Sequence, residues 1–185
     1  MPTLDRILPY TKKILNQCVT RGETVIDATV GNGNDTLFLS ELVGADGLVV
    51  GFDVQQAAID ATKIQLEQAD IKNVKLIHDG HEHILKYVDT TVAAAIFNLG
   101  YLPGSDKSVT TTGSTTWQAV IDILSLLKQG GLIILVIYHG HEAGKIERNE
   151  IEAAVATLDP AKTEVLRYQF LNKVDAPYVI VIERK

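Results

Sequence analysis

The stretch that decides the fold is VIDATVGNGNDT, residues 25–36. A short apolar run ends in the carboxylate of Asp27, passes two closely spaced glycines, Gly31 and Gly33, and opens an amphipathic helix over Leu37 to Val43. A strand, a tight turn and a helix N-terminus in this order are how α/β proteins present backbone N–H groups to a nucleotide-like ligand. We therefore predict a ligand pocket above this turn, which the remainder of the chain completes.

Length and composition predict one domain, residues 1–185, with a sizeable core. The chain is 46% hydrophobic and 22% charged, with a mean hydropathy of +0.11. No apolar run approaches the roughly 20 residues of a membrane span, and the N-terminus lacks the order of an export signal. The single Cys18 favours a reducing compartment. We therefore expect a cytoplasmic protein without membrane contact, whose net charge of −6 argues against a chain-wide grip on nucleic acid but allows a local basic patch.

Apolar runs and helical spacings alternate along the chain and predict five strand–helix units followed by a hairpin. Strands are expected at Glu23 to Thr29, Leu48 to Asp53, Val74 to His78, Val92 to Leu99, Leu132 to Ile137, Thr163 to Phe170 and Pro177 to Glu183. Helices are expected at Thr3 to Val19, Leu37 to Val43, Gln55 to Ala69, His81 to about Val88, Trp117 to Lys128 and Lys145 to Leu158. The fold class is thus α/β, a doubly wound, Rossmann-like, mostly parallel seven-stranded sheet with an antiparallel C-terminal hairpin.

Glycine and proline refine these boundaries. The N-terminal helical segment covers about residues 3–21, and Pro9 marks a restart or kink within it. Gly130 and Gly131 are expected to close the helix that starts at Trp117. The polar loop before this helix, Ser105 to Thr116, is long for a connection in a compact domain, which favours function or mobility.

The glycine turn departs from the dinucleotide pattern G-x-G-x-x-G, because Thr36 occupies the third glycine position. That glycine permits close helix–strand packing under a pyrophosphate, so its absence disfavours NAD. Asp27, Asn34 and Asp35 give the turn an acidic rim, which suits a ligand carrying an ammonium and a sulfonium better than a pyrophosphate. The alternative is a turn that merely needs positive φ at glycine.

Carboxylates also follow the next two predicted strands. Asp53 ends the second strand about twenty residues past the turn, where it could accept hydrogen bonds from ribose hydroxyls or cap the following helix. Asp79, beside Gly80, follows the third strand and could face an adenine edge or cap the helix that starts at His81. Open α/β sheets bind ligands at the carboxyl ends of their strands, so three carboxylates on this rim favour a ligand site.

The fourth strand leaves the sheet through FNLGYLPG, residues 97–104. The Asn98 carbonyl could accept a hydrogen bond from a substrate amine, and the ring of Tyr101 could form a wall of the pocket. The alternative is a turn built from glycine and proline.

The fifth strand is followed by YHGHE, residues 138–142. The spacing H-E-x-x-H is absent and no cysteine accompanies the histidines, so we do not expect a metal site. His139, at the strand end, is placed to accept a proton or donate a hydrogen bond over the pocket. His141 could equally be a solvated loop residue.

Three motifs together resemble the family labelled "putative rRNA methylase", small bacterial class I S-adenosylmethionine-dependent methyltransferases. They are DATVGNGNDTL at 27–37, NLGYLPG at 98–104 and YHGH at 138–141, and the match begins near ILPY at 7–10. The resemblance implies a class I methyltransferase fold. It also implies a tRNA methyltransferase that converts 5-aminomethyl-2-thiouridine to 5-methylaminomethyl-2-thiouridine at the wobble position, with the anticodon region of tRNA as partner.

The resemblance also implies which residues bind S-adenosylmethionine. The methionine moiety would lie against Asp27, Gly31, Asn32, Gly33, Asn34, Asp35 and Thr36, the ribose against Asp53 and Gln55, and the adenine against Asp79, Gly80 and His81. Asn98 and Tyr101 occupy the position where many amine-methylating relatives carry Asn/Asp-Pro-Pro-Tyr, although Leu99 and Gly100 replace the two prolines.

The expected reaction is in-line displacement by a neutral primary amine on the methyl group of the cofactor. A primary ammonium is mostly protonated near neutrality, so the site must disfavour its charge or supply a base. His139 is the candidate base, Asn98 the orienting residue and Tyr101 a wall. Alternatives are an rRNA or small-molecule methyltransferase, a nicotinamide-dependent oxidoreductase, or a non-catalytic nucleotide-binding module.

An RNA substrate requires a basic surface on this acidic chain. The candidates are Lys12, Lys13, Arg21, Lys107 and Lys145, although each could simply be a solvated surface residue. An extruded anticodon base could stack on Tyr101 or Trp117, unless Trp117 belongs to the core. The terminal hairpin or the N-terminal helix could supply the face of a homodimer.

Overall fold

The computed structural model of the chain describes residues 3–100 and 111–185. The strands found there are β1 (Thr24–Asp27), β2 (Leu48–Asp53), β3 (Val74–His78), β4 (Val92–Leu99), β5 (Leu127–Ile137), β6 (Thr163–Tyr168) and β7 (Tyr178–Arg184). The helices are α1 (Ile7–Cys18), α2 (Asn34–Val43), α3 (Gln56–Gln68), α4 (Gly113–Leu126) and α5 (Glu142–Val155), with a short 3-10 helix, η1 (His81–Lys86).

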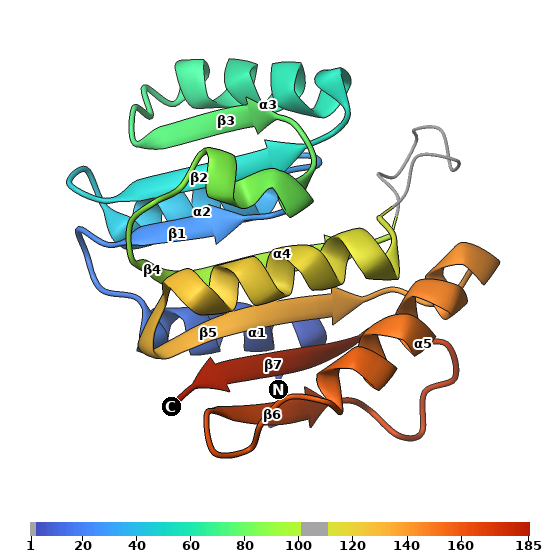
Figure 1. Ribbon diagram of the computed structural model, residues 1–185. Coiled ribbons are helices and arrows are strands. Elements are labelled where there is room, and N and C mark those ends of the chain that lie inside the picture. The colour runs from blue at the N-terminus through green and yellow to red at the C-terminus, as the bar shows by residue number, and fades with distance from the viewer. Residues whose placement is uncertain (1–2, 101–110) are drawn as a thin grey trace.

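The strands form one sheet in the order β3-β2-β1-β4-β5-β7-β6. The pairs from β3 through β5 are parallel, whereas β7 runs antiparallel to both β5 and β6. Figure 1 shows the parallel strands pointing toward one edge, where β1, β2, β4 and β5 end. The predicted α/β class, the doubly wound parallel sheet and the antiparallel C-terminal hairpin are confirmed.

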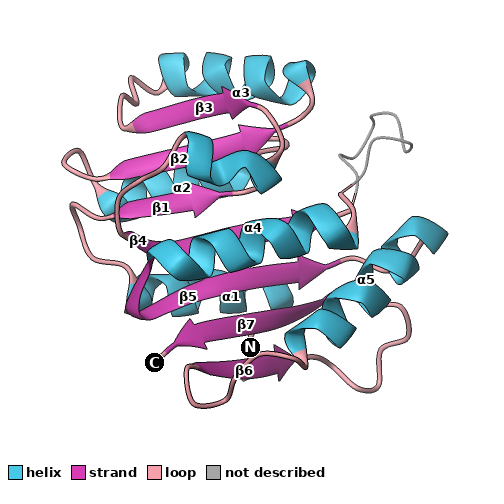
Figure 2. Ribbon diagram, in the orientation of Figure 1, coloured by secondary structure: helices cyan, strands magenta, loops and turns pink. Residues whose placement is uncertain are grey.

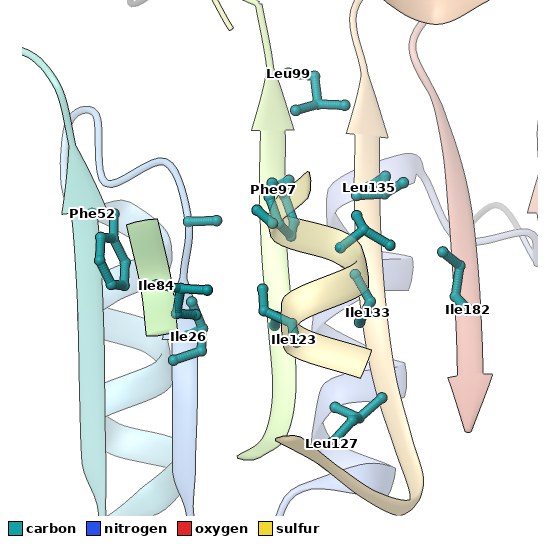
Figure 3. Close-up of a cluster of buried hydrophobic side chains, with 14 of the residues drawn as sticks. Ile26, Phe52, Ile84, Phe97, Leu99, Ile123, Leu127, Ile133, Leu135 and Ile182 are labelled. Atoms are coloured by element: carbon teal, nitrogen blue, oxygen red, sulfur yellow. The ribbon is translucent and has the colours of Figure 1, made fainter. Parts of the chain in front are cut away.

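Helices cover both faces of the sheet, with α4 and α5 in front and α1 and α2 behind in the view of Figure 2. Successive strand residues point to opposite faces, so β4 contributes to two cores. Phe97 and Leu99 join the core beneath η1, α4 and α5, where Ile84 and Ile123 also pack (Figure 3). Ile96 joins the second core, under α1 and α2. Burial on both faces explains why the Val92–Leu99 strand reads as a continuous apolar run.

Several boundaries agree with prediction. Strands β2, β3 and β4 occupy the predicted residues, and α3 differs by one residue at each end. The first strand is shorter than predicted, and α2 begins at Asn34 rather than Leu37. The N-terminal helix begins at Ile7 rather than Thr3. Pro9 is therefore its third residue, in the first turn, where a backbone N–H has no intrahelical partner to lose, so the predicted restart or kink is unnecessary.

The predicted helix over Trp117 to Lys128 is wrong at both ends. It starts at Gly113, because Thr112 caps it. The Thr112 hydroxyl accepts a hydrogen bond from the Thr115 backbone N–H, and the Thr115 hydroxyl accepts one from the Thr112 backbone N–H. Part of the expected polar loop is thus helix, and Ser105 to Thr110 lie outside the described residues. At the other end β5 begins at Leu127 and contains both glycines that were expected to close the helix.

The last helix also starts earlier than predicted, at Glu142 instead of Lys145. His141 is its N-cap, and His141 Nδ1 accepts a hydrogen bond from the Gly144 backbone N–H at 3.1 Å. The solvated-loop alternative for His141 is therefore wrong. Across residues 3–100 and 111–185, none of the helices combines the length and apolar character needed to cross a membrane.

Candidate functional site

A cavity of about 1190 Å³ opens at the carboxyl ends of β1, β2, β4 and β5. The chain leaves β1 toward β2 on one side and β4 toward β5 on the other, so β1 and β4 form the switch point where open α/β sheets bind ligands. Predicted site residues in the cavity wall are Gly31, Asn32, Asn34, Asp35, Asp53, Gln55, Asp79, Gly80, His81, Asn98 and His139. Tyr101 lies outside the described residues.

The glycine turn is held in place by the carboxylate of Asp53. Asp53 Oδ2 accepts from the Gly31 backbone N–H at 2.8 Å, and Oδ1 accepts from the Gln55 backbone N–H at 2.9 Å. Gln55 is itself the N-cap of α3, so Asp53 does not cap that helix. Gly33 has φ +78°, and a Cβ there would lie 2.8 Å from Thr62 Oγ1. The turn therefore requires glycine both for its conformation and for its approach to α3.

Three of the predicted cofactor residues, Asp27, Gly33 and Thr36, are absent from the cavity wall. Asp27 is 0% exposed; its Oδ2 accepts from the Thr36 hydroxyl at 2.6 Å and its Oδ1 from the Thr29 backbone N–H at 3.2 Å. Burial raises the pKa of Asp27 to about 7, and the nearby charges of Asp35 and Asp53 act in the same direction. Asp27 thus ties the end of β1 to the first turn of α2 from below the cavity.

The carboxylate of Asp79 is engaged by its own segment. Its oxygens accept from the Tyr87 hydroxyl at 2.7 Å, from His83 Nδ1 at 2.8 Å and from the Gly80 backbone N–H at 2.8 Å. These hydrogen bonds, that from Tyr87 foremost, lower the pKa of Asp79 to about 2. Gly80 is the N-cap of η1. Tyr87 and His83 were not predicted from the sequence, because the turn of η1 after β3 is what brings their side chains back to Asp79.

His81 connects this segment to the glycine turn. Its Nδ1 lies 2.9 Å from the Ala28 carbonyl oxygen, and because a carbonyl only accepts, Nδ1 carries the hydrogen. Burial lowers the pKa of His81. A neutral imidazole therefore lies against the end of β1, with its ring edge-on to Phe97.

Asn98 and Asp35 meet in the cavity wall. Asn98 Nδ2 donates to Asp35 Oδ2 at 2.6 Å, and the Asn98 backbone N–H donates to Thr29 Oγ1 at 2.7 Å. Because a carboxylate only accepts, the amide nitrogen must face Asp35, and the amide carbonyl faces away from it. Tyr138, which sequence analysis did not single out, lines the same cavity; burial raises the pKa of its hydroxyl, and the charge of Asp35 adds to this.

His139 is 7% exposed and contacts the segment before β7. Its Nε2 lies 3.0 Å from the Ala176 carbonyl oxygen, and its Nδ1 lies 3.9 Å from Asp175 Oδ1. The contact with the carbonyl places the hydrogen on Nε2, so Nδ1 of the neutral ring is an acceptor. The ring packs beside Tyr178, with 5.6 Å between ring centroids.

Among the candidate basic RNA contacts within residues 3–100 and 111–185, Lys12 is the one that lines the cavity. It lines the cavity with Leu8, one turn earlier on α1, and its Nζ lies 5.0 Å from the ring centroid of Phe38. Lys13 instead pairs with Asp5 at 2.9 Å. Arg21 packs over Gly44 and Lys145 is 4.0 Å from Glu142, while Lys107 lies outside the described residues. Trp117 packs against the core and does not line the cavity.

The sequence and the fold are both similar to known methyltransferases. The family described as "Putative rRNA methylase" matches residues 49–183. The chain is 37% identical over 183 residues to the chloroplastic tRNA (mnm(5)s(2)U34)-methyltransferase of Arabidopsis thaliana, an alignment that covers 93% of this chain and 67% of that protein.

Two solved structures resemble the whole chain. One, described as a "putative rRNA-methylase" from Clostridium thermocellum, has a TM-score of 0.97 at 40% identity and covers 100% of both chains. The other, described as a "putative methyltransferase" from Streptococcus mutans in complex with SAH, has a TM-score of 0.91 at 41% identity and covers 99% of this chain and 100% of that one.

Proposed function

Because this chain belongs to the family described as "Putative rRNA methylase", we propose that it methylates the 5-aminomethyl group of 5-aminomethyl-2-thiouridine at the tRNA wobble position. The chain is an S-adenosylmethionine-dependent methyltransferase, as its relatives' names and the SAH-bound structure indicate. The RNA and the amine are the proposed part, and the name of the plant relative supports them. The structural observation that carries the proposal is the Asn98–Asp35 pair in the cavity wall.

The residues of the cavity fit S-adenosylmethionine. Each oxygen of Asp53 accepts one backbone N–H and retains a lone pair for a ribose hydroxyl. Among the charged side chains of the wall, five carboxylates stand against Lys12, the single lysine or arginine among the described lining residues. This charge balance suits a ligand with a sulfonium and an ammonium, whereas a pyrophosphate would be repelled. When bound, the cofactor supplies an electrophilic methyl group.

The acceptor amine must be neutral to attack, since an ammonium has no lone pair. In our proposal the Asn98 carbonyl accepts a hydrogen bond from the amine and orients it. His139 Nδ1, a buried atom with no hydrogen-bond partner among the described residues, accepts the proton that the ammonium loses. The hydrogen bond between Asn98 and Asp35 keeps the amide in one orientation, so that the carbonyl needs no rearrangement when the substrate arrives. Tyr101 remains our candidate for a wall at this end.

The proposal is tested by incubating the protein with isotopically labelled S-adenosylmethionine and tRNA that carries 5-aminomethyl-2-thiouridine. We expect label in 5-methylaminomethyl-2-thiouridine after digestion and nucleoside mass spectrometry. The same tRNA without the aminomethyl group is the matched control and should remain unlabelled. In a parallel incubation with rRNA, label in the rRNA but none in the tRNA would overturn the proposal in favour of the activity that the family description names.

A local phosphate contact at Lys12 gives a further prediction. Replacing Lys12 by alanine should weaken tRNA binding and reduce the slope of log affinity against log salt concentration by about 0.7 to 0.9, since one counterion fewer is released. Lys13→Ala is the matched control, because the neighbouring Lys13 is paired with Asp5 and does not line the cavity. Filter binding across a salt series measures both slopes. Equal slopes for the two variants would exclude a contact specific to Lys12.

A further inference from the structure

Helix α5 carries a carboxylate that the proposed chemistry does not use. Glu147 is 4% exposed, its Oε2 accepts from the Thr111 hydroxyl at 2.8 Å, and its Oε1 accepts from the Thr116 hydroxyl at 3.1 Å. Within residues 3–100 and 111–185, no lysine or arginine forms an ion pair with Glu147. Burying a carboxylate among hydroxyls without a cation is costly, so its place here calls for an explanation.

The two hydroxyls lead to different parts of the molecule. Thr111 Oγ1 also accepts from the Gly100 backbone N–H at 3.3 Å, and the Thr111 backbone N–H donates to the Gly100 carbonyl at 3.4 Å. Thr116 lies in the first half of α4, fully buried and outside the cavity wall. Glu147 thus reaches the end of β4 through Thr111, whereas its bond to Thr116 only joins α5 to α4.

Gly100 lies at the acceptor end of the cavity. It follows Asn98 by two residues, lines the cavity together with Thr111, and has φ +149°, a conformation that favours glycine. A glycine has no side chain with which to fix its own position. The two hydrogen bonds with Thr111 therefore restrain the backbone that follows Asn98, and Glu147 in turn restrains the hydroxyl of Thr111.

We propose that Glu147 is a positioning residue for methyl transfer, which holds Gly100, and with it Asn98 two residues earlier, in register with the acceptor through the hydroxyl of Thr111. Glu147 touches neither substrate nor cofactor. The inference rests on the proposed function for the identity of the acceptor, but the restraint on Gly100 follows from the contacts alone. Loss of the restraint should affect the acceptor and leave the cofactor end of the cavity, at Asp53 and Asp79, unchanged.

The test compares three substitutions in one hydrogen-bonded group. Glu147→Gln and Thr111→Val disturb the link to Gly100, whereas Thr116→Val removes a buried hydroxyl bonded to the same carboxylate but leaves that link. We expect the first two to lower kcat/KM for the acceptor tRNA by about 10- to 100-fold, as misplacement of a reacting group does. Affinity for S-adenosylmethionine, measured by calorimetry, should change less than about twofold in both variants. Thr116→Val should cost stability with kinetics near those of the unsubstituted protein.

Hydrogen–deuterium exchange gives a readout that needs no acceptor. The backbone N–H of Gly100 should exchange faster in Glu147→Gln and Thr111→Val than in Thr116→Val, with all proteins held well below their melting temperatures. If exchange at Gly100 is alike in all three, or if Thr116→Val lowers kcat/KM as much as Thr111→Val, the positioning role is overturned. A protein that methylates no aminomethyl-tRNA but shows the exchange difference would instead overturn the proposed function and leave the restraint on Gly100 supported.

Discussion

Replacing His139 by alanine is expected to lower turnover by roughly 10²- to 10⁴-fold, the usual contribution of a general base, while affinity for S-adenosylmethionine changes little. The expectation follows from the contacts of the ring. Nε2 is committed to the Ala176 carbonyl, which leaves Nδ1 of a neutral imidazole as the acceptor. Single-turnover assays together with calorimetry separate the two effects, and unchanged turnover would exclude the base role.

A glutamine at the same position separates proton transfer from packing. The side-chain amide of His139→Gln can still donate to the Ala176 carbonyl, so the segment before β7 should keep its place. The amide has no basic nitrogen, however, and should not restore turnover. If His139→Gln restores most of the activity, the ring serves as a support and not as a base.

The sheet was largely predictable because its strands are marked locally. The segments Leu48–Asp53 and Val92–Leu99 are apolar runs bounded by turn residues or charges, and burial in a parallel sheet selects for such runs. Helix starts were less predictable, since they depend on capping. Thr112 and His141 are N-caps within segments that read as polar loops, and neither follows the commonest pattern of a capping residue before an apolar run.

That polar residues after β1, β2 and β3 line one cavity was predictable from residue type and strand position, but the contacts between segments were not. Asp35 and Asn98 are 63 residues apart in the chain, and their hydrogen bond exists because β1 and β4 are neighbours in the sheet. No local sequence pattern specifies the order of the strands in a sheet. The direction of the Asp27 side chain was also not predictable. It accepts a hydrogen bond from Thr36 beneath the turn and does not enter the cavity.

The burial of Glu147 could have been predicted from its helical spacing, although the charged composition of the segment suggests an exposed position. Glu147 lies among charged residues of α5 and resembles a solvated helix face. Its spacing from Gly144, Ile151 and Val155, however, is three, four and eight residues, which places all four on one side of the helix. That side packs against the sheet and α4, so a carboxylate at this position is buried.

In the unsubstituted protein the free energy of unfolding should fall as pH rises, because Asp27 ionises. The substitution Asp27→Asn should abolish this part of the decrease. Burial raises the pKa of Asp27 from 3.8 to about 7, so between these values the folded chain holds a proton that the unfolded chain has released. The free energy of unfolding therefore falls as pH rises through this window and the loss is complete above pH 7. At about 1.4 kcal/mol per pKa unit, the loss approaches about 4 kcal/mol.

Asp27→Asn retains the shape of the side chain and an acceptor for the Thr29 backbone N–H but cannot ionise. Denaturant unfolding of the two cofactor-free proteins from pH 4.5 to 8.5 should show Asp27→Asn gaining stability relative to the unsubstituted protein as pH rises, and the difference cancels groups that titrate alike in both. A second variant, Thr36→Val, tests the contribution of the hydroxyl to the pKa of Asp27. The Thr36 hydroxyl bonds the carboxylate and lowers its pKa, so its removal should extend the decline to higher pH. Parallel stability curves for Asp27→Asn and the unsubstituted protein would mean that Asp27 is ionised throughout, with its charge stabilised by the N–H and hydroxyl groups at the turn.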